Sequence, residues 1–587
     1  MCGIIGMNGR DEKALREAGA CFAYRGPDAS AFFSDNVITL GHHRLAIVDL
    51  DPRSTQPFSD TEKKVWIVFN GEIFNFKEVR EKLTSKYSFR TTSDTEVLVY
   101  AYREWGMDMT KHIEGMYALA IYDTDKKKVF LMRDHVGIKP LYYYAEGGVF
   151  AFASEQKGLM SILRKRGVTP SLDIESLDFF FALGYIPSPY SMYKGVKKLR
   201  KASYLEYDLV KKEVVREARC EFAPVHVSNG DEYMKLIEKK VLSHLIADVP
   251  VGVFFSGGTD SSLIASILHR HGIDLETFSI KLDYKTEDAK YFDLISKHLK
   301  LKSHVYDFNV AELDSVYEEV MTKLDEPTYD NSIFPTYFVS KKASEKVKVV
   351  LSGEGGDEFF YGYPRSLELS RMNGKRDYGI TLLDYIFLLT PPFKAKNHVF
   401  QKLFRMARQP MSYYLMSMSP ARDRATLSQW RRAKAEFKKR NVAGVEIDQE
   451  FYLEDDLLRK TDLATSYVSI EGRVPLLDID IVRNASVVES EKLADGVLKA
   501  FLKKMLATYI PPELVYRSKS GFGVNMVTFF EKSAHLRPSL IQAIAFLSDR
   551  GIATPRVGNI DKAIRKYPHL CFSLIALHRS IVNNEHS

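Results

Sequence analysis

Short apolar runs separated by turn residues fill the first third of this 587-residue chain. The strand-like runs lie at 65–69, 116–122, 129–132, 141–144 and 149–153. Turn residues at 123–125 and 147–148 separate them, which is typical of strands joined by hairpins. A helical stretch at 96–105 interrupts them, with Ser93 and Glu96 at capping-box spacing and Gly106 at its end. The first third therefore predicts a layered α+β domain.

A different pattern begins near residue 249, where apolar runs alternate with helical stretches. Strand-like runs lie at 249–255, 277–280, 305–307 and 347–351, and helical stretches at 263–268, 287–299 and 333–344. This alternation predicts a parallel sheet with helices on both faces. Ligands bind at the carboxyl ends of the strands in such a sheet, and two glycine-rich turns fall there.

The segment between residues 169 and 228 is mixed, with prolines, a short helical stretch at 173–184 and clusters of Lys and Glu. A chain of this length exceeds what one core usually holds. We expect two domains, 2–205 and 229–587, with the boundary near residues 200–228.

Composition narrows the class of protein. Apolar residues make up 45% and charged residues 27%, as in soluble globular proteins. The net charge of +7 comes from 83 basic and 76 acidic residues spread along the chain, so nucleic-acid binding is not indicated. Four scattered cysteines without a CxxC pair predict neither a zinc site nor disulfides and fit a reducing cytoplasm. The longest apolar run, near 380–390, is too short to span a bilayer, so no membrane partner is expected.

The turn at 256–262, SGGTDSS, joins the strand at 249–255 to a helix. Glycines let backbone N–H groups approach an anion, and the helix dipole favours negative charge there. Asp260 would repel a bare phosphate, so we interpret it as a Mg²⁺ ligand that acts together with phosphates. No lysine follows, which excludes the Walker pattern. The turn resembles the SGGxDS pyrophosphate loop of enzymes that split ATP into AMP and pyrophosphate.

The second turn, SGEGGDE at 352–358, follows the strand at 347–351. Asp357 is a second metal ligand opposite Asp260 in our interpretation. Glu354 would deprotonate an attacking amine or relay protons from a tetrahedral intermediate.

Cys2 is the chemical centre expected in the first domain. If Met1 is removed, Cys2 carries both a thiol and a free α-amine, whose ordinary pKa is about 8. The amine then serves as the base for its own thiol, as in other N-terminal nucleophiles.

Ordered motifs around Cys2 resemble the class II glutamine amidotransferase domain. They are CGIIG at 2–6, RGPD at 25–28, GHHRLAIVD at 41–49, NGEIFN at 70–75, SDTE at 93–96 and RDHVGIKPL at 133–141. The resemblance covers residues 2 to about 160 and implies an N-terminal nucleophile fold, an αββα sandwich.

The same resemblance implies a glutamine pocket. Its residues would be Arg44, Leu45, Ile47, Val48, Asn70, Gly71, Glu72 and Asp94. Arg44 would hold the α-carboxylate with its forked guanidinium, and Asp94 and Glu72 would hold the α-ammonium. The Asn70 side chain and the Gly71 N–H would form the oxyanion hole after Cys2 attacks the amide.

The rest of the chain, about 229–530, resembles the synthetase domain of the asparagine synthetase family. Its motifs include DEP at 325–327, PTY at 335–337, KTD at 460–462, EGRVPLLD at 471–478 and RSKSGFGV at 517–524. The resemblance implies an ATP-pyrophosphatase (adenine nucleotide α-hydrolase-like) fold in which Lys519 contacts the phosphates as a point charge. The implied ATP site consists of Phe255, Ser256, Gly257, Gly258, Asp260, Ser261, Ile280, Ser352 and Gly353, with Phe255 and Ile280 flanking the adenine and ribose.

These two resemblances predict a coupled reaction. Glutamine is hydrolysed at Cys2, and ammonia crosses a shielded channel to a carboxylate activated by ATP and Mg²⁺ as an acyl-adenylate. Aspartate is the acceptor in the asparagine synthetase family, but relatives amidate sugar acids and natural-product precursors, so the acceptor stays open. An RNA-modifying pyrophosphate-loop enzyme is an alternative of a different class, and a homodimer is compatible with the sequence.

Overall fold

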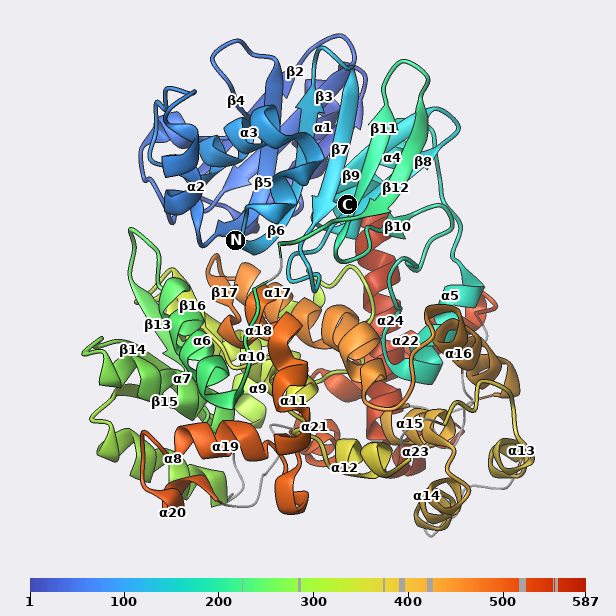
Figure 1. Cartoon of the computed structure of the whole chain (residues 1–587). Coiled ribbons are helices and arrows are strands. Elements are labelled where there is room, and N and C mark those ends of the chain that lie inside the picture. Colours follow the sequence, from blue (N-terminus) through green and yellow to red (C-terminus); the bar gives the residue numbers. More distant parts are fainter. Residues whose placement is uncertain are drawn as a thin grey trace.

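The computed structural model describes all residues of the chain except 224, 283–286, 373–374, 390–395, 420–425, 517–523, 553 and 555–557. It consists of a strand-rich part stacked on a larger, helix-rich part (Figure 1). The N-terminus lies on the face of the strand-rich part that is turned towards the helix-rich part. Cys2, next to the N-terminus, therefore lies at the boundary between the two parts.

Two six-stranded sheets of antiparallel strand pairs form the strand-rich part. The first has the order β10-β8-β9-β1-β3-β2, with β1 (Gly3–Asn8), β2 (Ala29–Ser34), β3 (Ile38–Arg44), β8 (Tyr142–Glu146), β9 (Val149–Ala153) and β10 (Lys197–Lys198). The second has the order β12-β11-β7-β6-β5-β4, with β4 (Phe58–Ser59), β5 (Val65–Ile73), β6 (Gly115–Asp123), β7 (Lys128–Arg133), β11 (Ser203–Asp208) and β12 (Glu213–Arg219). The sheet thus runs to Arg219, beyond the expected limit of residue 205.

Helices cover the outer faces of both sheets, which gives four layers. Side chains of α1 (Glu12–Ala20) and α4 (Gln156–Lys165) share a core with the first sheet, and α2 (Phe76–Leu83) and α3 (Asp94–Trp105) share one with the second. Alternation along β1 separates these cores, because Ile4 lies between the sheets and Ile5 faces the helices. The arrangement agrees with the predicted layered α+β domain.

A five-stranded parallel sheet is the centre of the helix-rich part, as the alternating pattern predicted. Its order is β15-β14-β13-β16-β17, with β13 (Val251–Phe254), β14 (Glu276–Leu282), β15 (Lys302–Phe308), β16 (Val349–Leu351) and β17 (Glu471–Arg473). Among its helices, α7 (Thr259–Arg270), α8 (Glu287–His298) and α10 (Ile333–Ser344) match the predicted stretches. The turns after β13 and β16 lie at neighbouring strand ends, because these two strands pair directly.

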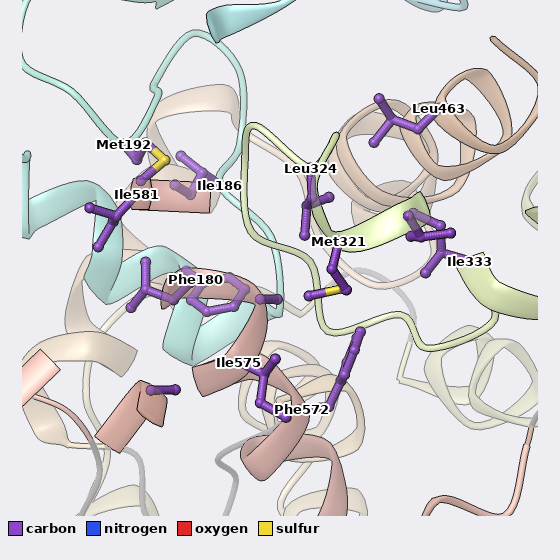
Figure 2. Close-up of a cluster of buried hydrophobic side chains, with 14 of the residues drawn as sticks. Phe180, Ile186, Met192, Met321, Leu324, Ile333, Leu463, Phe572, Ile575 and Ile581 are labelled. Carbon is purple, nitrogen blue, oxygen red and sulfur yellow. The ribbon is translucent and has the colours of Figure 1, made fainter. Parts of the chain in front are cut away.

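The C-terminal helix α24 (Pro568–His586) joins the two parts. Figure 2 shows its side chains in one buried cluster with residues from both parts, among them Phe180, Ile186, Met192, Met321, Leu324, Ile333, Leu463, Phe572, Ile575 and Ile581. Asn584 donates a hydrogen bond to the Asp325 carbonyl at 2.6 Å, and the Gln156 side chain donates to the same oxygen at 2.8 Å. The two parts therefore share a core and do not form separate globules.

Candidate functional site

Cys2 lies directly before β1, with its thiol against the segment that follows β3. The backbone N–H of Leu45 donates to Cys2 Sγ at 3.5 Å, and Arg25 Nε donates to the Cys2 carbonyl at 3.1 Å. Burial raises the pKa of the Cys2 thiol, and burial lowers the pKa of the Met1 α-amine to about 5. Met1 itself is fully buried. A base close to the thiol is therefore needed before it can act as a nucleophile.

Asn70, in β5, has a side chain whose hydrogen-bonding groups are not satisfied by the described residues. Its side chain is fully buried, and neither Nδ2 nor Oδ1 finds a hydrogen-bond partner among the described residues. A buried amide without partners is costly, so such a group is expected to bind something. At the neighbouring Gly71, a Cβ atom would lie 2.0 Å from the Met116 carbonyl oxygen, so only glycine fits.

Two buried carboxyl groups, Glu72 and Asp94, follow this pair. The backbone N–H of Ile73 donates to Asp94 Oδ2 at 3.2 Å. Burial raises the pKa of Asp94 to about 6, and burial together with Asp94 raises the pKa of Glu72 well above its usual range. Arg473, at the end of β17 in the helix-rich part, pairs with Glu72 at 2.9 Å. The predicted glutamine pocket is thus in direct contact with the helix-rich part.

Arg44 ends β3, and its guanidinium donates to the carbonyls of Asp49 and Asp51, at 2.9 Å for Asp51. Leu45 and Ile47 are buried against Val349 of β16, with Cys2 and the half-buried Val48 packed beside them. The predicted glutamine pocket is therefore in contact with the strand that leads into the second glycine-rich turn.

The first glycine-rich turn, after β13, is a network of hydroxyl groups. Ser256 and Ser261 share a hydrogen bond between their hydroxyls at 3.2 Å, and Ser256 Oγ accepts from the Gly258 N–H at 3.3 Å. Gly257 has a φ of +72° and lies so close to Phe292 that a Cβ would be 2.9 Å from its Cα. The Phe255 ring packs against Phe292 with centroids 5.2 Å apart.

Ile280, which follows in β14, is half-buried near the end of its strand. It packs against the cluster that contains Phe278 and Val350, and also against the shared core. The structure thus places Ile280 on the strand next to β13, on the side where the predicted nucleotide site lies.

The two glycine-rich turns meet at Asp260. A Cβ on Gly356 would lie 2.4 Å from Asp260 Oδ1, and one on Gly353 would lie 2.8 Å from Asp260 Cβ. Lys499 Nζ pairs with both Asp260 and Asp357, at 2.8 Å for Asp357. Burial opposes the charge on Lys499, but the two carboxylates raise its pKa. Sequence reasoning expected the two carboxylates to lie together, and it counted Lys499 among the positions that resemble the family without giving it a role.

Glu354 lies beside a second group of charged side chains. Its carboxylate accepts from the Ser352 hydroxyl and from Thr461 Oγ1, at 2.9 Å for Thr461. Lys460 pairs with Asp330 at 3.7 Å. Both Glu354 and the buried Asp456 act on the charge of Lys460, whose pKa is raised although burial opposes this. No local pattern in the sequence marks Asp330 or Asp456.

Predicted residue Lys519 lies in the segment 517–523, outside the described residues. Among the residues that are described, no group of three or more His, Cys, Asp and Glu side chains has the geometry to hold a metal ion. None of the helices in the described part has the length and apolar character that crossing a bilayer requires. Within the same part of the chain, the four cysteines are free thiols.

Comparison with known proteins agrees with this geometry. The glutamine amidotransferase domain model matches residues 1–217, and the asparagine synthase model matches residues 232–550. Asparagine synthetase [glutamine-hydrolyzing] 1 of Bacillus subtilis (strain 168) is 30% identical over 574 residues, covering 89% of this chain and 87% of its own. The chain belongs to the glutamine-hydrolysing asparagine synthetase family.

Other relatives are similar over a smaller share. Asparagine synthetase B [glutamine-hydrolyzing] of Escherichia coli (strain K12) is 32% identical over 372 residues, 60% of this chain and 61% of its own. A solved structure titled as the allosteric regulatory enzyme of purine biosynthesis has a TM-score of 0.28 and 18% identity, and covers 49% of this chain and 67% of that chain.

In this member of the asparagine synthetase family, buried ion pairs line the boundary between the two parts. Arg25 is fully buried and pairs with Glu155 at 3.1 Å and with Asp462 at 2.9 Å. Arg133 pairs with Glu454 at 2.5 Å. A small cavity lies beside the last pair, lined in part by Ile138, Leu141, Tyr142 and Lys198.

Proposed function

We propose that this enzyme makes asparagine from aspartate, ATP and glutamine, with AMP, pyrophosphate and glutamate as the other products. Membership of the glutamine-hydrolysing asparagine synthetase family carries the proposal. The structure supports it by the contact between Leu45 and Ile47 of the glutamine pocket and β16, which leads to Glu354. Two reaction centres connected by one short strand suit a nitrogen that is released at one and used at the other.

At the first centre, the α-amine of Cys2, freed by removal of Met1, takes the thiol proton. The thiolate attacks the glutamine amide carbon, ammonia leaves, and water then hydrolyses the thioester to glutamate. The unpartnered Asn70 side chain and the Gly71 N–H stabilise the oxyanion. Arg44 binds the α-carboxylate, and Asp94 with Glu72 binds the α-ammonium.

At the second centre, the residues fit a magnesium ion. Asp260 and Asp357 present hard carboxylate oxygens from two turns that meet around one cation, Lys499. Gly356 leaves the room that this approach needs. The ion, when bound, would neutralise charge on the ATP phosphates. Ser256 and Ser261 donate to the same phosphates, and Lys519 contacts the leaving pyrophosphate.

The charged group beside Glu354 supports an acceptor that carries an ammonium. Three carboxyl groups, those of Glu354, Asp330 and Asp456, lie close to Lys460, which pairs with Asp330. One oxygen of the buried Asp456, Oδ2, has no hydrogen-bond partner among the described residues. Aspartate offers an α-ammonium to this excess of carboxyl groups and an α-carboxylate to Lys460, whereas a sugar acid offers no cation.

Ammonia must pass between the centres without being lost to solvent. The buried boundary around Arg133 and Glu454, with its small cavity, is our proposed route. We also propose a cytoplasmic location, which the four free thiols suit, and a homodimer. Sedimentation of the purified enzyme tests the assembly.

Product analysis tests the function. The enzyme is incubated with amide-labelled glutamine, ATP, Mg²⁺ and a panel of carboxylates that includes aspartate and uronic acids, and the products are measured by mass spectrometry. We expect labelled asparagine together with equimolar AMP. Labelled product from a uronic acid in place of aspartate would overturn the choice of acceptor.

Cys2→Ala tests the division of labour between the centres. We expect complete loss of glutamine-dependent synthesis and full synthesis from ammonium salts, because the second centre is untouched. Cys21→Ala, at a half-buried thiol away from the pocket, is the matched control. Loss of both activities in Cys2→Ala would show that the two centres are not separable.

Glu354→Gln tests the proton-transfer role. The variant keeps the shape of the side chain, so ATP should still bind, but asparagine formation should fall by at least about 100-fold, as for other general bases. Binding is measured by calorimetry and turnover by AMP release. Normal turnover in Glu354→Gln would exclude this residue as the base.

A further inference from the structure

The short helix α13 (Leu382–Leu389) turns an apolar stripe towards solvent. Leu382 is 75% exposed, Tyr385 49%, Ile386 43% and Leu389 60%. Their spacing of three, four and seven residues places them on one helix face. The opposite face is fixed, because Phe387 is fully buried and Asp384 pairs with the buried Lys434 at 2.7 Å.

The neighbouring helix α14 (Lys396–Met406) extends this surface. Val399 is 52% exposed and Met406 70%, while Phe400 and Phe404 pack inward against Phe387 with ring centroids 5.1 and 6.0 Å apart. We name the exposed set the tip patch: Leu382, Tyr385, Ile386, Leu389, Val399 and Met406. Six of the sixteen large apolar side chains exposed on the described chain lie in it, so the exposure is concentrated and not scattered.

Basic side chains border the tip patch. Lys402, Arg405 and Arg408 are exposed on and just after α14, and Arg405 also pairs with Glu368 at 3.1 Å. Asp384 is buried and neutralised by Lys434, so it adds no negative charge to the surface. Figure 1 places α13 and α14 at the outer edge of the helix-rich part, on the side away from the strand-rich part. A flat partner can therefore reach the tip patch without touching the rest of the molecule.

We propose that the tip patch docks on an anionic lipid surface. The apolar side chains enter the boundary between headgroups and acyl chains, and the basic residues lie at the level of the lipid phosphates. Tyr385 suits this depth, since its ring is apolar and its hydroxyl is polar. The contact is peripheral and needs no spanning helix.

A second copy of the chain is a less suitable occupant. A two-fold interface uses the same patch on both subunits, which would bring Lys402, Arg405 and Arg408 close to their own copies. Facing like charges oppose association. An anionic lipid surface satisfies both the apolar and the basic residues at once.

Vesicle co-sedimentation tests the proposal with the full-length enzyme. We expect binding to vesicles of phosphatidylcholine with phosphatidylglycerol, weak binding to phosphatidylcholine alone, and weakening by salt. The double variant L382S/L389S should lower the partition coefficient at least about tenfold, since buried apolar area drives insertion. K402E/R408E should lower binding to the anionic vesicles and leave binding to phosphatidylcholine unchanged.

Matched controls separate the tip patch from general surface effects. V210S/I541S removes two apolar side chains that are 65% and 49% exposed elsewhere, and K211E/K239E reverses two exposed lysines elsewhere. Both should bind vesicles like the unchanged enzyme, and all four variants should keep their activity without vesicles. Absence of binding, equal binding to both lipid mixtures, or a dimer that L382S/L389S dissociates would overturn the proposal.

Discussion

Glu72 and Asp94 show how strongly burial shifts the pKa of a carboxyl group. Neither carboxyl group lies in water, and the pKa of Asp94 rises to about 6 because burial disfavours its charged form. A group with a raised pKa keeps its proton up to a higher pH. In the proposed glutamine pocket the α-ammonium needs the carboxylate form, so a proton on Asp94 would compete with glutamine.

This competition predicts a pH dependence for the glutaminase alone. As pH falls through about 6, Asp94 becomes protonated and kcat/KM for glutamine should fall, approaching tenfold per pH unit. Synthesis from ammonia, compared at equal concentrations of free NH₃, should lack this decline. Asp94→Asn should have a low kcat/KM for glutamine at every pH, and its pH profile should lack the inflection near pH 6. An inflection retained in Asp94→Asn would assign it to another group.

The predictability of the site differs from residue to residue, for a physical reason. Cys2, Asn70 and Asp260 occupy local motifs next to strands, and such motifs can be read from neighbours in the chain. Lys499 and Asp456 join the site only when distant segments fold together, so no local pattern assigns them a role. Glu96 illustrates the same limit, because its carboxylate accepts from the N–H groups of Arg90 and Thr91 and does not complete the expected capping box.

At the scale of elements, the two glycine-rich turns can approach each other closely because glycine has no side chain to keep them apart. The approach of Gly356 to the Asp260 carboxylate leaves no space for a methyl group. The turns follow the paired strands β13 and β16, so their separation is fixed by the sheet. Any added atom must displace Asp260, which the nucleotide site needs.

Gly356→Ala should therefore impair the ATP-dependent step specifically. A displacement of about 1 Å at a reacting group costs on the order of 100-fold, and we expect a loss of that size in asparagine formation. Glutamine hydrolysis at Cys2 should persist. Gly379→Ala is the matched control, because a Cβ there would meet no atom within 4 Å. If Gly356→Ala turned over normally, the close contact with Asp260 would be unimportant for catalysis.

Helices whose apolar residues recur at a clear helical period were predicted closely. Two strands, β5 and β12, show which features the apolar pattern does not reveal. The helix α10 was expected at 333–344 and is found there. β5 continues to Ile73, past the expected end at residue 69, because the polar, fully buried Asn70 and the small, half-buried Gly71 still pair with β6. β12 was not expected, since it is an edge strand with mostly exposed residues and no apolar face.

For the whole molecule, buried charges fix how the two parts sit together. Arg25 comes from the strand-rich part and Asp462 from the helix-rich part, and both are shielded from water. Removing Arg25 leaves the Asp462 carboxylate buried without this partner, which is far more costly than losing an exposed pair.

Arg25→Met should lower the free energy of unfolding by about 3–5 kcal/mol. R25M/D462L removes both charges and should recover a large part of that loss, as measured by denaturant unfolding in a double-mutant cycle. Arg16→Met breaks the exposed pair with Glu12 and should cost at most about 0.5 kcal/mol. Additive effects of Arg25→Met and Asp462→Leu would mean that this pair does not couple the parts.

The short strand β16 lies between the two proposed reaction centres. Val349 packs against Leu45 and Ile47, and three residues later the chain enters the turn of Glu354. Thermodynamic reciprocity then applies: by whatever factor bound nucleotide changes the affinity for glutamine through this strand, bound glutamine changes the affinity for nucleotide by the same factor. Titrating either ligand in the presence of the other would therefore measure the same coupling, carried by the three residues of β16.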